Sequence, residues 1–116
     1  MLSTAYEPLK LGPITLLNRF IKAGANENMS KKGRPTRAMR MHHEELVKGG
    51  VGMTTMAYVA VEKEGRTLPD QVWIHDRAMA DLRAVTDAVH AAGGKIAAQI
   101  TPVSYTHLTL PTTYTV

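Results

Sequence analysis

Three apolar segments stand out along the chain, and most of the polar residues lie between them. They span residues 18–24, 51–61 and 95–101, and each is a nearly continuous apolar run rather than an alternation of apolar and polar positions. Runs of this kind are typical of parallel strands that are covered on both faces. The sequence therefore predicts three parallel strands.

Two helices are predicted between these strands. The first follows Pro35, which suits a first-turn position, and covers residues 36–48. Its weak apolar stripe consists of Met39, His43, Leu46 and Val47. The second helix starts at Asp76, a residue type favoured at the N-cap. Its stripe recurs in steps of four and three, at Ala78, Leu82, Val85, Val89 and Ala92. Glycine pairs follow both helices, as is common at helix ends.

The predicted order of elements is βαβαβ, which is an α/β fold. The strands start at residues 18, 51 and 95. This spacing fits a (β/α)8 barrel, with about 30 residues per unit, and it also fits a doubly wound sheet. Residues 9–17 predict a preceding hairpin with its turn at Gly12 and Pro13. Long loops at 27–34 and 62–75 leave the C-terminal ends of the first two strands, where both architectures place the active site.

Composition narrows the function classes. The chain has 116 residues, of which 44% are hydrophobic and 21% charged, the balance of a globular domain. It has no cysteine, which excludes disulfide scaffolds, thiol catalysis and iron–sulfur clusters. No apolar run approaches the ~18 residues of a membrane span, and residues 1–10 show no signal-peptide pattern. We therefore expect a cytoplasmic protein without a membrane partner.

The charge balance permits a nucleic-acid partner without favouring one. The formal net charge is +4, but only 5% of the residues are aromatic, and no nucleic-acid-binding motif is present. We expect a small-molecule substrate and no nucleic acid, and the oligomeric state is left open.

The end of the chain differs in composition from the rest. Residues 103–116 hold five threonines and no charged residue. Residues 103–112 resemble one reading frame of a transposon-tagging sequencing adapter, and the alternative is a threonine-rich strand. We expect residues 1–101 to be the N-terminal part of a domain and 102–116 to be a non-native tail.

Several local motifs have simple structural explanations. The glycines at 49–52 leave a helix and enter a strand, which is the wrong order for a phosphate loop. His42 and His43 point about 100° apart on a helix and cannot easily share a metal ion, so we expect a solvated face with one half-buried histidine. Five basic residues are either a solvated face or a phosphate-attracting patch: Lys31, Lys32, Arg34, Arg37 and Arg40.

Two polar residues fall inside strands that should be covered on both faces. Lys22 lies in the first predicted strand and Gln99 in the third. A buried lysine needs a partner or a polar cavity, and an unpaired buried amide costs about 1–3 kcal/mol. Either residue has an internal hydrogen-bond partner or serves a ligand.

A family resemblance emerges at these residues. Residues 17–26 resemble the opening of the Old Yellow Enzyme group of NADH:flavin oxidoreductases, with the sequence Leu-Asn-Arg before a strand of small and apolar residues. Residues 49–53 resemble that group's junction between first helix and second strand, residues 64–67 its following loop, and residues 88–100 its second helix and third strand. The order and spacing of these segments make the resemblance specific.

This resemblance implies the first units of a (β/α)8 barrel with FMN at its C-terminal mouth. It also implies that NADH or NADPH gives a hydride to the flavin, which passes one to an electron-poor alkene. The protein's part in such chemistry is to position and tune the cofactor.

The resemblance also implies roles for individual residues. Ala23, Gly24, Ala25 and Asn26 match the segment that lies against the isoalloxazine, where small residues permit close approach. Asn26 falls beside flavin N5 and O4, and Gln99 matches the glutamine that binds the pyrimidine edge. Tyr58 falls at a backbone contact from the second strand. Many members have Ser-Pro-Met in place of Ala23–Ala25, and Thr or Cys in place of Asn26.

The catalytic residues of the family lie beyond the resembling segments, so none is assigned. Three strands cannot close a barrel and leave edges unpaired, so we expect the 116-residue chain alone to be inactive and the full-length parent to be the enzyme. The alternatives are a small stand-alone α/β binding domain and a (β/α)8 enzyme without flavin.

Overall fold

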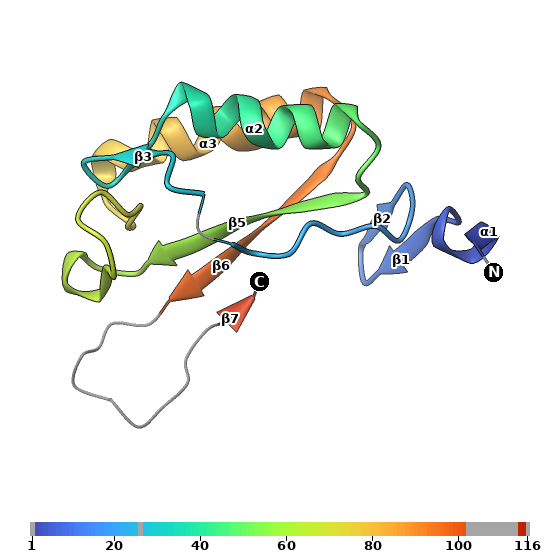
Figure 1. The fold of residues 1–116 in the computed structure, drawn as a ribbon, viewed down its shortest axis with the longest axis horizontal. Coiled ribbons are helices and arrows are strands. Elements are labelled where there is room, and N and C mark those ends of the chain that lie inside the picture. Colours follow the sequence, from blue (N-terminus) through green and yellow to red (C-terminus); the bar gives the residue numbers. More distant parts are fainter. Residues whose placement is uncertain (1, 26, 102–113, 116) are drawn as a thin grey trace.

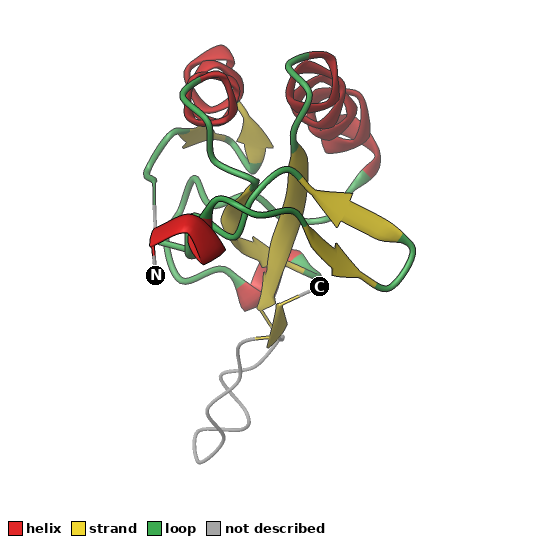
Figure 2. Ribbon diagram, turned by 90° about the vertical axis from the view of Figure 1, so that its right-hand side faces the viewer, coloured by secondary structure: helices red, strands yellow, loops and turns green. Residues whose placement is uncertain are grey.

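Two parallel strands with two helices on one face form the centre of the fold (Figure 1). The computed structural model describes residues 2–25, 27–101 and 114–115. In chain order its elements are α1 (Leu2–Ala5), β1 (Leu9–Leu11), β2 (Ile14–Leu16), β3 (Ser30–Lys31), β4 (Arg34–Pro35), α2 (Arg37–Lys48), β5 (Met53–Ala60), the 3-10 turn η1 (Lys63–Gly65), α3 (Asp76–Ala91), β6 (Lys95–Thr101) and β7 (Tyr114–Thr115). Figure 2 shows α2 and α3 end-on, side by side above the strands.

β5 and β6 confirm the second and third predicted strands and their parallel pairing. Their register runs from Met53 opposite Lys95 to Ala60 opposite Thr101, with an irregularity between Met56 and Val59. β7 pairs antiparallel with β6. The predicted hairpin is also confirmed, because β1 and β2 pair antiparallel across a turn with Gly12 at a φ of +56°. This hairpin lies near the N-terminal ends of β5 and β6 (Figure 1).

The first predicted strand is the exception. Within residues 18–24 the structure has one isolated parallel bridge, between Ile21 and Met53. The side chain of Asn18 accepts a hydrogen bond from Phe20 N at 3.0 Å and donates one to Gly50 O at 2.6 Å. The bond from Phe20 N is local and competes with a strand ladder, and the bond to Gly50 O ties Asn18 to the chain before β5. The prediction of a strand over all of 18–24 is therefore wrong, although the chain still runs beside the start of β5.

Both predicted helices are present, with small differences at their starts. Thr36 is the N-cap of α2, and its hydroxyl accepts a hydrogen bond from Met39 N at 3.3 Å. In α3 the N-cap position is His75, and Asp76 is the first helical residue. The assignment of Asp76 as N-cap was therefore wrong by one residue, and its negative charge in the first turn still favours the helix.

The core lies between the helices and the helix-facing side of the two strands. Its buried members come from both helices, from β5 and from the loop before α3: Met39, Met56, Val59, Val72 and Val85. Ile96, Ala98 and Ile100 of β6 pack against them. Because side chains alternate along a strand, Gln99 belongs to the face of β6 turned away from the helices.

We predict that Gly94→Ala destabilises the protein by about 1–3 kcal/mol through overpacking. A Cβ at Gly94 would lie 2.3 Å from Val47 Cγ1, where the end of α2 meets the start of β6. Urea unfolding measures the effect. Adding Val47→Ala should offset part of it, so the double variant should lose less stability than the two single losses added together. Strict additivity would contradict this packing account.

Candidate functional site

Gln99 and Gly24 come together beside the C-terminal half of β6. The Oε1 atom of Gln99 is buried and has no hydrogen-bond partner among the described residues. It faces the backbone of Gly24, because a Cβ built there would lie 2.6 Å from Oε1. Any larger residue at Gly24 would displace the amide. The pair therefore forms a polar spot next to bare backbone.

Tyr58 lies level with Gln99 on the neighbouring strand. Met56 pairs with Ala98 and Val59 with Ile100, so Ala57 and Tyr58 together oppose Gln99. Tyr58 has a φ of +52°, a conformation that non-glycine residues adopt at a cost. Two residues opposite one is the pattern of a β-bulge, a feature over-represented next to active sites.

The other predicted cofactor-contacting residues flank this spot. Ala23 and Ala25 are exposed on either side of Gly24, and Asn26 lies outside the described residues. The structure thus brings Gly24, Gln99 and Tyr58 into one neighbourhood. The roles given to these six residues stay predictions.

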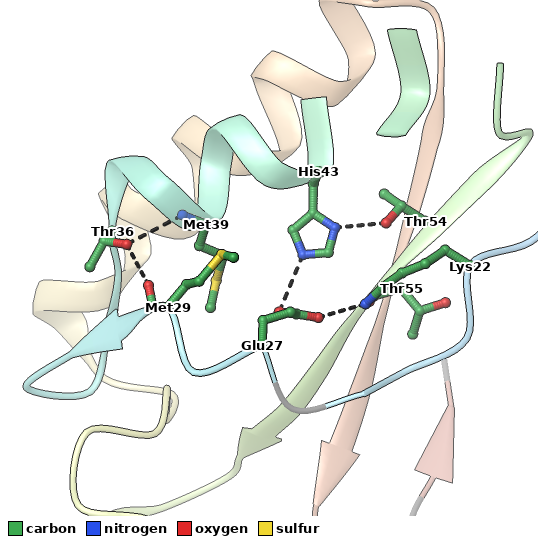
Figure 3. A network of polar contacts seen from close by, with 8 residues as sticks. All are labelled: Lys22, Glu27, Met29, Thr36, Met39, His43, Thr54 and Thr55. Atoms are coloured by element: carbon green, nitrogen blue, oxygen red, sulfur yellow. Dashed lines mark hydrogen bonds and ion pairs between the residues drawn. The ribbon is translucent and has the colours of Figure 1, made fainter. Parts of the chain in front are cut away.

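A buried charge network, which the sequence analysis did not assign, lies beside this neighbourhood (Figure 3). Lys22 Nζ donates a hydrogen bond to Glu27 Oε2 at 2.7 Å and another to the carbonyl of Thr55 at 3.2 Å. The side chain of Glu27 is 4% exposed and that of Lys22 18%. Lys22 therefore has the partner that its place in an apolar run required.

His43 links the network to α2. Its side chain is fully buried, deeper than the half-buried position expected from the sequence. Its Nδ1 is 2.7 Å from the Thr54 hydroxyl, and its Nε2 is 3.4 Å from Glu27 Oε1. A carboxylate only accepts hydrogen bonds, so a hydrogen on Nε2 would face Glu27, and Thr54 would then donate to Nδ1 of a neutral ring. Lys22 and His43 thus meet at Glu27, and each of them also contacts β5, through Thr55 O and the Thr54 hydroxyl.

The surroundings of Glu27 favour its ionised form. Burial acts to raise the pKa of Glu27, but hydrogen bonds and charges from His43 and Lys22 lower it, and the resulting pKa lies below the ordinary value. Burial lowers the pKa of the adjacent His42, and the charge of His43 lowers it further. At neutral pH the network therefore centres on a charged carboxylate beside a lysine.

Two hollows lie near these residues. A cavity of about 120 Å³ is lined in part by Glu27, Met39, Tyr58 and Gln71. A larger open cleft of about 750 Å³, here called the basic cleft, carries five cations and two carboxylates on its walls: Lys32, Arg34, Lys63, Arg66, Arg77, Asp70 and Asp76. The stacked rings of Trp73 and His75, 4.2 Å apart, also line it.

Comparison with known proteins gives the chain its family. Residues 4–108 match the family described as NADH:flavin oxidoreductase / NADH oxidase. The chain belongs to this family. None of the described helices is long and apolar enough to cross a membrane.

The chain is also similar to individual members. It is 44% identical over 95 residues to the 4,4'-dithiodibutanoate disulfide reductase of Rhodococcus erythropolis, covering 82% of this chain and 24% of that protein. The old yellow enzyme of Trypanosoma cruzi superposes with a TM-score of 0.73 at 26% identity, covering 86% of this chain and 27% of that one. Morphinone reductase in complex with tetrahydroNAD superposes with a TM-score of 0.75 at 27% identity, covering 83% of this chain and 26% of that one. The chain spans about a quarter of the length of these relatives.

These relatives settle the fold class. They are TIM-barrel enzymes of the Old Yellow Enzyme group, and this chain matches part of their barrel. FMN and a nicotinamide donor are the cofactors of the family, as the sequence resemblance implied. The residues present fit FMN: among the described residues the buried Oε1 of Gln99 has no partner, and the missing side chain of Gly24 lets the bare backbone lie against the Gln99 amide.

The contribution of Glu27 to stability is predicted to depend on pH. Its pKa is lower in the folded chain than the ordinary 4.5, so its stabilisation is present above that value and is lost as the pH falls through the folded pKa. In the full-length protein, the difference in unfolding free energy between wild type and Glu27→Gln should be large at neutral pH and shrink below about pH 4.5.

Urea unfolding across this pH range measures the difference. Glu44→Gln is the matched control, because Glu44 forms only an exposed contact with Lys48, at 3.9 Å, on the same helix as His43. It should change stability by less than about 1 kcal/mol at every pH. A difference for Glu27→Gln that stays constant with pH would contradict the assignment.

Proposed function

We propose that the full-length protein is an FMN-dependent oxidoreductase that uses NADH or NADPH to reduce an activated alkene or a similar electron-poor acceptor. Bound FMN would supply the redox chemistry, namely hydride transfer between the nicotinamide and the acceptor. The residues of this chain bind and orient the flavin. The observation that carries the proposal is the unpartnered Gln99 Oε1 facing Gly24.

The chemistry of the flavin suits this spot. The pyrimidine edge of an isoalloxazine has both an N–H donor and carbonyl acceptors, so it can pair with both halves of a primary amide. Binding of the flavin would then remove the penalty of about 1–3 kcal/mol that an unsatisfied buried polar group carries. Ala23, Gly24 and Ala25 let the backbone approach a flat ring, Asn26 supplies a donor near N5 and O4, and Tyr58 offers a backbone contact.

We predict that Gln99→Ala weakens FMN binding by roughly two- to a hundredfold, the value of one or two neutral hydrogen bonds. Gly24→Ala should weaken it as well, because the added Cβ would meet Gln99 Oε1. Flavin fluorescence quenching measures Kd on the full-length apo-protein.

The matched control is Gln71→Ala. Gln71 is also buried, but its Oε1 accepts hydrogen bonds from the backbone N–H groups of Thr67 and Leu68. Its loss should lower stability and leave the Kd for FMN unchanged. A Gln99→Ala protein with the wild-type Kd for FMN would contradict the assignment of Gln99 to the flavin-binding site. A full-length protein that stays colourless with added FMN would contradict the proposed function.

A second acceptor class is favoured by the basic cleft. The relative from Rhodococcus erythropolis is named for reducing 4,4'-dithiodibutanoate, a disulfide that ends in two carboxylates. The five cations of the basic cleft suit such an anion. We propose a carboxylate-bearing disulfide as the alternative acceptor: one NAD(P)H and one proton reduce the S–S bond to two thiols, and NAD(P)+ is released.

For this alternative we predict that the double variant Lys63→Gln/Arg77→Gln raises KM for dithiodibutanoate by roughly three- to tenfold at low salt. KM for a neutral enone should not change, and added salt should narrow the difference. Arg83→Gln is the control, because Arg83 lies on α3 outside the residues that line the basic cleft. An unchanged KM for the disulfide would assign its carboxylates to another part of the protein.

A further inference from the structure

The segment of residues 23–26 lies between two residues of opposite charge. Lys22 directly precedes it and Glu27 directly follows it, and their side chains meet at 2.7 Å. The ion pair therefore joins the two residues that flank this short segment. We name the pair, together with His43, the staple (Figure 3).

The staple is attached to both layers of the fold. On the strand side, Lys22 Nζ donates to Thr55 O, and the backbone N–H of Lys22 donates to Met53 O at 2.9 Å. On the helix side, Glu27 faces His43 of α2, which is bonded to Thr54 of β5. The first end of the segment is thus bonded to β5, and the second end contacts His43 of α2, which is in turn bonded to β5.

The chain after the staple is held as well. The hydroxyl of Thr36, the N-cap of α2, donates a hydrogen bond to Met29 O, and the side chain of Met29 packs against the core. The path from Glu27 into α2 is therefore also fixed by contacts outside the staple, among them the ion pair of Arg34 with Asp81 at 2.6 Å. This leaves residues 23–25 as the described stretch whose position depends on the staple.

Stability alone does not explain a buried ion pair. Apolar residues of similar volume often serve a fold equally well, because desolvation offsets much of the attraction between the charges. An ion pair with hydrogen bonds differs from an apolar contact because it requires one relative orientation of its two side chains. It is therefore suited to a place where the backbone must adopt one conformation. The staple flanks Ala23, Gly24 and Ala25, which are assigned above to the face of the flavin.

We propose that Lys22, Glu27 and His43 are positioning residues that hold residues 23–25 in the conformation that receives the isoalloxazine. This inference rests on the proposed function. None of the three residues is assigned a contact with the ring, and their effect passes through the backbone of the segment. A preformed segment binds more tightly because it loses less conformational freedom on binding.

The first test needs no flavin. Hydrogen–deuterium exchange is measured on the full-length apo-protein for peptides covering residues 22–29, in wild type, Glu27→Gln and the neutral pair Lys22→Met/Glu27→Gln. Exchange in both variants should be faster by about tenfold in this segment, with β6 unchanged. The control Glu44→Gln should behave as wild type. Unchanged exchange in the neutral pair would overturn the proposal.

The second test separates positioning from stability. Glu27→Gln leaves a buried lysine unpaired, whereas the neutral pair removes both charges, so its urea midpoint should recover most of the loss. The Kd for FMN should remain about tenfold weaker than wild type in both variants. A neutral pair that recovers FMN affinity together with stability would show a merely structural role and overturn the proposal.

The two tests distinguish failure of the positioning proposal from failure of the proposed function. A wild-type protein that binds no FMN contradicts the proposed function, and with it the flavin-positioning role. The exchange experiment still decides whether the staple orders the segment. Wild-type FMN binding with unchanged affinity in both variants contradicts the positioning role alone.

Discussion

The ion pair between Lys22 and Glu27 fixes the course of the chain past the edge of the two parallel strands. It is attached to β5 through Thr55 O and to α2 through His43. A charge this deeply buried is tolerated only with a close partner, because an unpaired one would cost several kcal/mol. The position of Gly24, and therefore its approach to Gln99, follows from this constraint.

The β-bulge of β5 adds a second constraint at the same place. It sets two residues, Ala57 and Tyr58, opposite Gln99 and gives Tyr58 a left-handed conformation. Local strain of this kind persists where the surrounding packing determines it. Here the helix-facing residues Met56 and Val59, on either side of the bulge, are core members. The packed core on one face thus supports an irregular backbone opposite Gln99.

The sequence was most informative where local signals agreed. β6 matches residues 95–101 because an apolar run follows a helix that ends in two glycines, and Gln99 stood out as an amide inside that run. The prediction of a strand at residues 18–24 is wrong because Asn18 forms hydrogen bonds with the nearby Phe20 N and the distant Gly50 O, which periodicity does not reveal.

The staple itself could not be found from periodicity. Glu27 and His43 lie on different elements, and their contact exists only in the folded chain. The usable signal was Lys22, since a lysine in an apolar run requires an acidic partner, and Glu27 is the first acidic residue after it in the chain.

In the proposed complex the flavin lies against Gly24, and its pyrimidine edge binds Gln99. The most direct measurement is a crystal structure of the full-length protein with FMN. We expect the isoalloxazine ring to lie over residues 23–25, and the Gln99 amide to lie within about 3 Å of the nitrogen or oxygen atoms of the pyrimidine edge. A flavin bound elsewhere, or a Gln99 amide paired only within the protein while FMN is present, would contradict it.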